Sequence, residues 1–112
     1  MDVPVRFRST WDAPALAGAR IAIEARDSET IATQIAVSEI AAPTGDEGER
    51  GAWMAERFRA LGLSDVRSDV AGNVLGTRAG AVDEDPVVIC AHLDTVFPGG
   101  VPLHVRQEGP RL

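Results

Sequence analysis

The stretch Val87–Pro98, which reads VVICAHLDTVFP, decides the fold predicted from the sequence. Its first five residues are apolar, and they are followed by His92 and, two positions later, Asp94. A short apolar run that ends at polar residues is typical of a strand buried on both faces. Ligands gather at the carboxyl ends of such strands, and side chains at i and i+2 point the same way. The imidazole and the carboxylate are therefore predicted to enter one pocket, as suits a metal-bound histidine beside a carboxylate.

Helical patterns dominate the chain before this run. Residues 1–11 are expected to be irregular, and alanine-rich Asp12–Ala25 is a predicted helix. A second helix is predicted to be capped by Asp27 or Ser28 and to end before Pro43.

A third helix is predicted from a capping-box pattern, with Thr44 at the cap and Glu47 three residues later. Its apolar residues follow helical spacing, so this face is expected to pack against a sheet. These residues are Met54, Phe58 and Leu61. The helix is predicted to end at Gly62. The charges of Asp46–Arg50 are interpreted as a solvated first turn.

After Gly62 the pattern changes to the alternation of a strand. Val66 and Val70 alternate with polar residues, and the turn residues 71–73 precede Val74, which predicts a hairpin. A short strand is predicted over Leu103–Arg106. The fold class is therefore α/β, with N-terminal helices, a β-hairpin and the buried strand of an incomplete α/β/α sandwich. Few elements remain to pair with that strand, so a truncated domain is expected.

Composition and charge exclude several classes of function. Seventeen acidic and eleven basic residues give a net charge of −6, which argues against nucleic acid and membrane surfaces as partners. No apolar run approaches the ~20 residues of a membrane helix, and the first residues lack the basic and apolar regions of a signal peptide, which argues against secretion. The single Cys90 cannot form an internal disulfide and is expected to pack as a small hydrophobe. A soluble cytoplasmic protein is expected.

The His-x-Asp pair has competing interpretations, because this spacing often arises by chance. His92, Asp94 and His104 could form a two-histidine, one-carboxylate site for non-haem iron. Such oxygenases are usually β-barrels, whereas the first half of this chain is helical, so His104 is predicted to be a surface strand residue. Gly72 and Gly76 lack the spacing of a phosphate-binding loop and are interpreted as turn and strand glycines.

Several linked segments occur in the order in which a known family has them. They are EIAAPTGDEGERG at Glu39–Gly51, LGL at Leu61–Leu63, GNV at Gly72–Val74 and HLDTV at His92–Val96. From Ile31 to Leu112 the chain resembles the di-zinc metallopeptidase and deacylase family. That family contains peptidase T, carboxypeptidase G, aminoacylase and acetylornithine deacetylase.

The resemblance implies a fold and a set of site residues. Residues 1–112 would be the N-terminal part of a truncated catalytic domain of the zinc-exopeptidase type, with residues 1–30 as an N-terminal helical extension. His92 would bind one of two zinc ions, or cobalt or manganese in their place. Asp94 would be the catalytic, active-site aspartate that orients the imidazole and raises its basicity.

The resemblance also implies an activity. The full protein would hydrolyse amide bonds of small peptides or N-acyl amino acids, as a homodimer formed through a lid domain that this sequence lacks. The bridging aspartate, the adjacent glutamate pair and the other ligands would lie beyond Leu112. Because zinc needs three or four protein ligands, the 112-residue chain alone is expected to be inactive and to bind zinc weakly.

The alternative is a complete small non-catalytic α/β module that serves binding or assembly. It predicts a natural stop codon after Leu112 and a cooperative, monodisperse fold. A fragment should instead aggregate through its open sheet edge.

Overall fold

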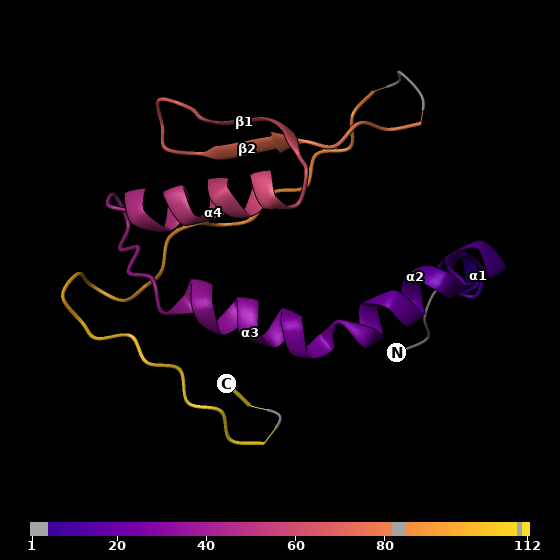
Figure 1. The fold of residues 1–112 in the computed structure, drawn as a ribbon, viewed down its shortest axis with the longest axis horizontal. Helices are drawn as coiled ribbons and strands as arrows, with labels where there is room; N and C mark the ends of the chain where they lie inside the picture. Colours follow the sequence, from indigo (N-terminus) through magenta and orange to yellow (C-terminus); the bar gives the residue numbers. More distant parts are fainter. Residues whose placement is uncertain (1–4, 82–84, 110) are drawn as a thin grey trace. The chain divides into compact units, whose positions relative to one another are not determined.

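The computed structural model describes residues 5–81, 85–109 and 111–112. Within these residues, four helices precede a two-stranded antiparallel sheet (Figure 1). The elements are α1 (Val5–Trp11), α2 (Pro14–Ala25), α3 (Asp27–Ser38), α4 (Gly48–Ala60), β1 (Ser64–Ser68) and β2 (Val74–Thr77). The chain divides into two compact units, Met1–Gln34 and Ile35–Leu112, which are described separately.

The first unit is helical. The prediction of an irregular start is wrong for residues 5–11, which form α1 because no glycine or proline interrupts them. Residues 1–4 lie outside the described residues. Helix α2 confirms the first predicted helix and has Pro14 at its start, where the missing N–H costs nothing. Helix α3 confirms the second predicted helix, which ends at Ser38, before Pro43, but Asp27 and Ser28 lie inside its first turn rather than at its cap.

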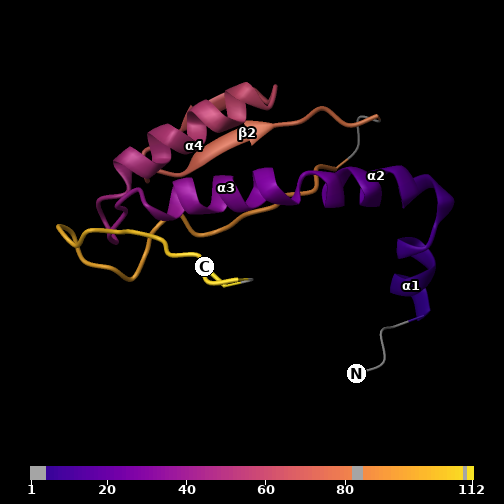
Figure 2. The ribbon, with the colours of Figure 1, turned by 60° about the horizontal axis from the view of Figure 1, so that its bottom comes forward.

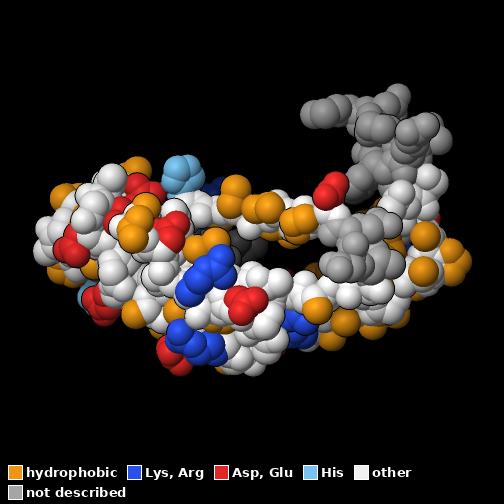
Figure 3. Space-filling model, turned by 90° about the horizontal axis from the view of Figure 1, so that it is seen from above, with side chains coloured by type: hydrophobic (Ala, Val, Ile, Leu, Met, Phe, Trp, Pro, Cys, Tyr) orange, Lys and Arg blue, Asp and Glu red, His pale blue; other side chains and the backbone are white. Residues whose placement is uncertain are grey.

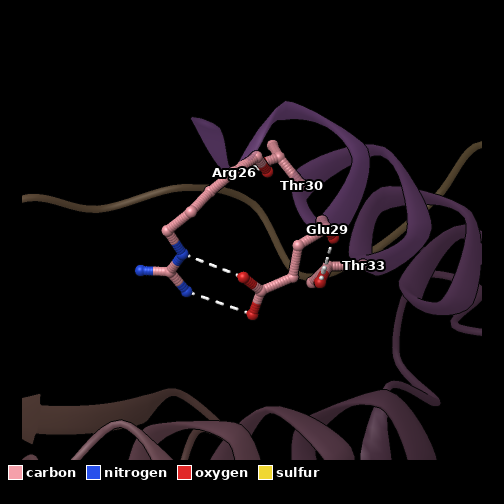
Figure 4. A network of polar contacts seen from close by, with 4 residues as sticks. All are labelled: Arg26, Glu29, Thr30 and Thr33. Carbon is pink, nitrogen blue, oxygen red and sulfur yellow. Dashed lines mark hydrogen bonds and ion pairs between the residues drawn. The ribbon is translucent and has the colours of Figure 1, made fainter. Parts of the chain in front are cut away.

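A polar network stabilises the start of α3 (Figure 4). The guanidinium of Arg26 faces the Glu29 carboxylate and donates two hydrogen bonds of 2.8 and 3.1 Å. The hydroxyls of Thr30 and Thr33 donate to the carbonyls of Arg26 and Glu29. These contacts satisfy local backbone groups at the junction of α2 and α3.

In the second unit, α4 lies along the hairpin (Figures 1 and 2). Phe58 and Leu63 pack closely over Gly76, where an added Cβ would lie 2.9 Å from each side chain. The predicted packed face is confirmed for Phe58, but Leu61 is 46% exposed and lies outside it. Gly62 has φ +74°, so the predicted end of the helix is confirmed.

The hairpin is also confirmed. Strands β1 and β2 pair antiparallel, with Arg67 opposite Leu75 and Ser68 opposite Val74. The turn contains Gly72 at φ +87°. The Asp69 carboxylate closes this turn, because Oδ1 accepts from the backbone amides of Ala71 and Asn73 and Oδ2 accepts from the Asn73 side-chain amide.

The turn predicts a pH dependence of hairpin stability. Hydrogen bonds lower the pKa of Asp69 below its ordinary value of 3.8, and the Asn73 side chain is the largest cause. A carboxyl whose pKa is lower in the folded state stabilises the fold fully above its unfolded pKa. We therefore expect the protection of the Asn73 backbone amide from hydrogen exchange to fall as the pH drops below 3.8. Asp69→Asn should remove most of this pH dependence, and an unchanged profile would contradict the prediction.

The prediction of a buried strand over residues 87–91 is wrong. These residues form no strand, and Val87, Val88 and Ile89 are 89%, 79% and 93% exposed. A strand needs a neighbour for its backbone hydrogen bonds, and none of the described residues pairs with this run. Cys90 is exposed as well, contrary to its predicted packing. Hydrophobic side chains are visible at the surface in Figure 3.

The C-terminal segment differs from its prediction too. Leu103–Arg106 is not a strand, because none of the described residues pairs with it as a neighbouring strand. The Val105 amide donates to Oε1 of Glu39 over 3.0 Å. The helices and the hairpin of the predicted α/β fold are therefore confirmed, while the zinc-exopeptidase-like sandwich stays a prediction.

The core of the second unit lies around the first turns of α4. Ala42 and Ala55 are 0% and 7% exposed, and Gly51 is buried as well. A Cβ at Gly51 would lie 3.5 Å from Leu93 and 3.6 Å from Val74. Leu93 is thereby packed against α4 beside β2, which brings His92 and Asp94 to the edge of this core. Among the described residues, no helix is long and apolar enough to span a bilayer.

Candidate functional site

Two segments far apart in the sequence meet beside α4. The Thr95 amide donates to the Ala42 carbonyl over 2.8 Å, and Pro43 and Thr95 form a parallel bridge. This contact places Thr44 next to the His92–Asp94 segment.

The Asp94 carboxylate connects the two segments through its side chain. Its Oδ2 accepts a 2.7 Å hydrogen bond from the Thr44 hydroxyl, and its Oδ1 lies 3.3 Å from Nδ1 of His92. The carboxylate side chain is 31% exposed, whereas that of His92 is 97% exposed. The structure therefore brings the predicted pair together, but the imidazole stands in solvent rather than lining a pocket.

Hydrogen bonding lowers the pKa of Asp94 below its ordinary value. The Thr44 hydroxyl is the largest cause, because it donates to the charged form of the carboxyl. The charge and hydrogen bonding of His92 act in the same direction, and partial burial acts against them. Asp94 is therefore ionised at neutral pH, and its Oδ1 is able to accept a hydrogen bond from the Nδ1–H of His92.

The capping role predicted for Thr44 is wrong. Helix α4 begins at Gly48, and no side chain caps its first turn. Glu47 bends back so that its Oε1 accepts from the Gly45 amide over 2.6 Å. The Thr44 hydroxyl is instead directed to Asp94, fifty residues later in the chain.

Arg50 is the site residue that the sequence does not reveal. Contrary to the predicted solvated turn, it is only 9% exposed. Its guanidinium donates through Nε (3.1 Å) and Nη2 to the Ile40 carbonyl, and through Nη1 to the Leu93 carbonyl over 3.0 Å. Because its partners are backbone carbonyls, which every residue has, no complementary acidic residue marks this role in the sequence. Arg50 holds together the two segments that carry Thr44 and Asp94.

His104 does not join this pair. Within the described residues, no three His, Cys, Asp or Glu side chains lie close enough to hold a metal ion together. The His92–Asp94–His104 triad considered for iron therefore does not form there. His104 is exposed, as predicted, but it is not part of a strand.

The donor chemistry of His92 fits a metal ligand. A ligating histidine usually donates its second ring N–H to a carboxylate, and Asp94 lies beside Nδ1. This leaves Nε2 as the free ring nitrogen, on a side chain that is almost fully exposed. One imidazole supplies one ligand, so a tightly held zinc ion requires further ligands from outside this group.

Compared with the sequence models of known protein families, the chain matches none, and no curated protein is similar enough to count as a relative.

Proposed function

We propose that residues 31–112 are the N-terminal part of a zinc-dependent hydrolase that cleaves amide bonds of small peptides or N-acyl amino acids. The observation that carries the proposal is the contact between Nδ1 of His92 and Oδ1 of Asp94. The ordered resemblance of the segments from Glu39 to Val96 supplies the reaction class. Neither observation would single out amide hydrolysis without the other.

Each residue of the pair has a distinct role in this proposal. His92 binds a zinc ion through Nε2, and Asp94 holds the ring and increases its basicity. When bound, zinc supplies a Lewis acid that polarises the scissile carbonyl. The other ligands of this ion, the ligands of a second zinc ion and the general base would come from chain beyond Leu112. A homodimer formed through a lid domain belongs to the same proposal.

The exposed apolar run favours the second candidate, a non-catalytic binding or assembly module. Val87, Val88 and Ile89 present contiguous apolar surface, which often marks an interaction site. In the binding module this run would contact another protein. Sequencing the gene past the codon for Leu112 separates the two. A frame that continues into further acidic and histidine ligands supports the hydrolase, and a stop codon overturns it.

His92→Ala in the complete gene product is the direct test of function. We expect loss of zinc-dependent hydrolysis of dipeptides and N-acetyl amino acids by at least about 100-fold, because a ligand and its oriented carboxylate are lost together. His104→Ala is the matched control and should retain activity, since His104 lies outside the pair. Full activity in His92→Ala, or no hydrolysis by the unmodified protein, would refute the proposal.

A further inference from the structure

We propose that Thr44 is a positioning residue: its hydroxyl fixes the Asp94 carboxylate so that the other carboxylate oxygen holds Nδ1 of His92 and leaves Nε2 open. The inference rests on the proposed function for its link to zinc, but its structural content concerns this chain alone. Thr44, which lies fifty residues before Asp94 in the chain, thereby controls which ring nitrogen of His92 carries the proton.

The imidazole of His92 is held only weakly by its surroundings. With 97% of its side chain exposed, His92 is not restrained by packing, so its orientation depends on Asp94. A carboxylate with one oxygen unrestrained can rotate about its terminal torsion, which is broad. The 2.7 Å hydrogen bond from Thr44 to Oδ2 opposes this rotation and keeps Oδ1 beside Nδ1, 3.3 Å away.

The backbone around Thr44 is itself held in place. The Thr95 amide bonds to Ala42, and Pro43 bridges Thr95, so the two segments are in register on either side of the hydroxyl contact. Arg50 binds the carbonyls of Ile40 and Leu93 just before each segment reaches the site. The hydroxyl therefore meets the carboxylate from a fixed backbone, as a positioning contact requires.

The first test measures the tautomer of neutral His92 by nitrogen-15 NMR at about pH 8.5, above the usual histidine pKa. In the unmodified chain we expect the ring proton on Nδ1, facing Asp94. Thr44→Val keeps the branched shape but removes the donor, and the proton should move mainly to Nε2, the tautomer that free histidine prefers in water. Thr44→Ser retains a hydroxyl and should restore the Nδ1 proton.

Two controls distinguish an effect on His92 from a general change in the sample or in the backbone. His104 is visible in the same spectrum and should keep one tautomer distribution in every variant. The Thr95 amide should stay protected from hydrogen exchange in Thr44→Val, which would show that the two segments remain joined. An unchanged His92 tautomer in Thr44→Val would overturn the role of Thr44. If the Thr95 amide loses protection in Thr44→Val and Thr44→Ser does not restore it, the role of Thr44 is overturned as well. Thr44 would then support the backbone contact between the two segments rather than position the carboxylate.

The link to zinc is tested separately in the complete gene product. Thr44→Val should weaken zinc binding by about tenfold, which is the low end of the effect of losing a residue that orients a metal ligand. The zinc affinity of Thr44→Ser should stay close to that of the unmodified protein. A tautomer shift together with no zinc binding by the unmodified protein supports Thr44 and refutes the proposed hydrolase. Zinc binding together with an unchanged tautomer refutes Thr44 and leaves the hydrolase intact.

Discussion

Arg50→Met is expected to lower the free energy of unfolding of the Ile35–Leu112 unit by about 2–3 kcal/mol, because two partly buried carbonyls lose a charged donor. Methionine keeps the apolar stem, so the loss reports on the guanidinium rather than on packing. The contacts that are removed join Ile40 and Leu93, which are 53 positions apart by their numbers in the sequence.

Urea unfolding followed by Trp53 fluorescence measures this effect, in a Trp11→Phe background so that Trp53 is the sole tryptophan. Arg59→Met is the matched control on the same helix. Arg59 pairs with Glu56 at the surface, where both side chains are more than half exposed, so its loss should cost less than about 0.5 kcal/mol. Equal stabilities of the two variants would refute the role assigned to Arg50.

A local measurement accompanies the global one. The Thr95 amide, which donates to Ala42, should exchange faster with solvent in Arg50→Met than in Arg59→Met. If Thr95 exchange is unchanged while stability falls, Arg50 stabilises α4 without joining the two segments.

Gly76→Ala is expected to lower the same free energy of unfolding by about 1–2 kcal/mol. The usual expectation has the opposite sign, because glycine in a strand interior is less favourable than alanine. Here the new Cβ would lie 2.9 Å from both Leu63 Cδ2 and Phe58 Cδ2, and 3.3 Å from Leu63 Cβ. The side-chain ends can shift, but Leu63 Cβ cannot move without its backbone, so overpacking outweighs the gain in strand propensity.

Gly48→Ala is the control for this change. It lies in the first turn of α4, and a Cβ there meets nothing within 4 Å. Its unfolding free energy should stay within about 0.5 kcal/mol of the unmodified chain. Chemical denaturation of both variants gives the comparison, and a Gly76→Ala chain at least as stable as the unmodified one would refute the close packing of α4 on the hairpin.

The parts of the fold that depend on neighbours in sequence could be predicted. Helix α4 ends where Gly62 adopts positive φ, and the hairpin turns at Gly72 with Asp69 bonded to Asn73. All of these contacts join residues a few positions apart, so residue type and spacing contain the required information. The adjacency of His92 and Asp94 is predictable for the same reason, since the two are separated by one residue.

The run at residues 87–91 could not be predicted from local sequence. Its apolar composition is compatible with a buried strand, but burial requires a paired neighbour and a covering layer. The structure leaves Val87 and Ile89 almost fully exposed, because nothing among the described residues supplies either. Apolar composition therefore permits a buried strand, but a paired neighbour and a covering layer determine whether the strand forms.

Helices α2, α3 and α4, the hairpin and the closeness of the imidazole to the carboxylate could be predicted from local sequence, whereas α1 could not. The contact between Thr44 and Asp94 and the burial of Arg50 against two carbonyls depend on tertiary packing. The physical reason is the separation of the partners: the Thr44 contact spans 50 residues and the Arg50–Leu93 contact 43. Local patterns carry no record of such distant pairs, because each forms only once packing has joined the segments around α4.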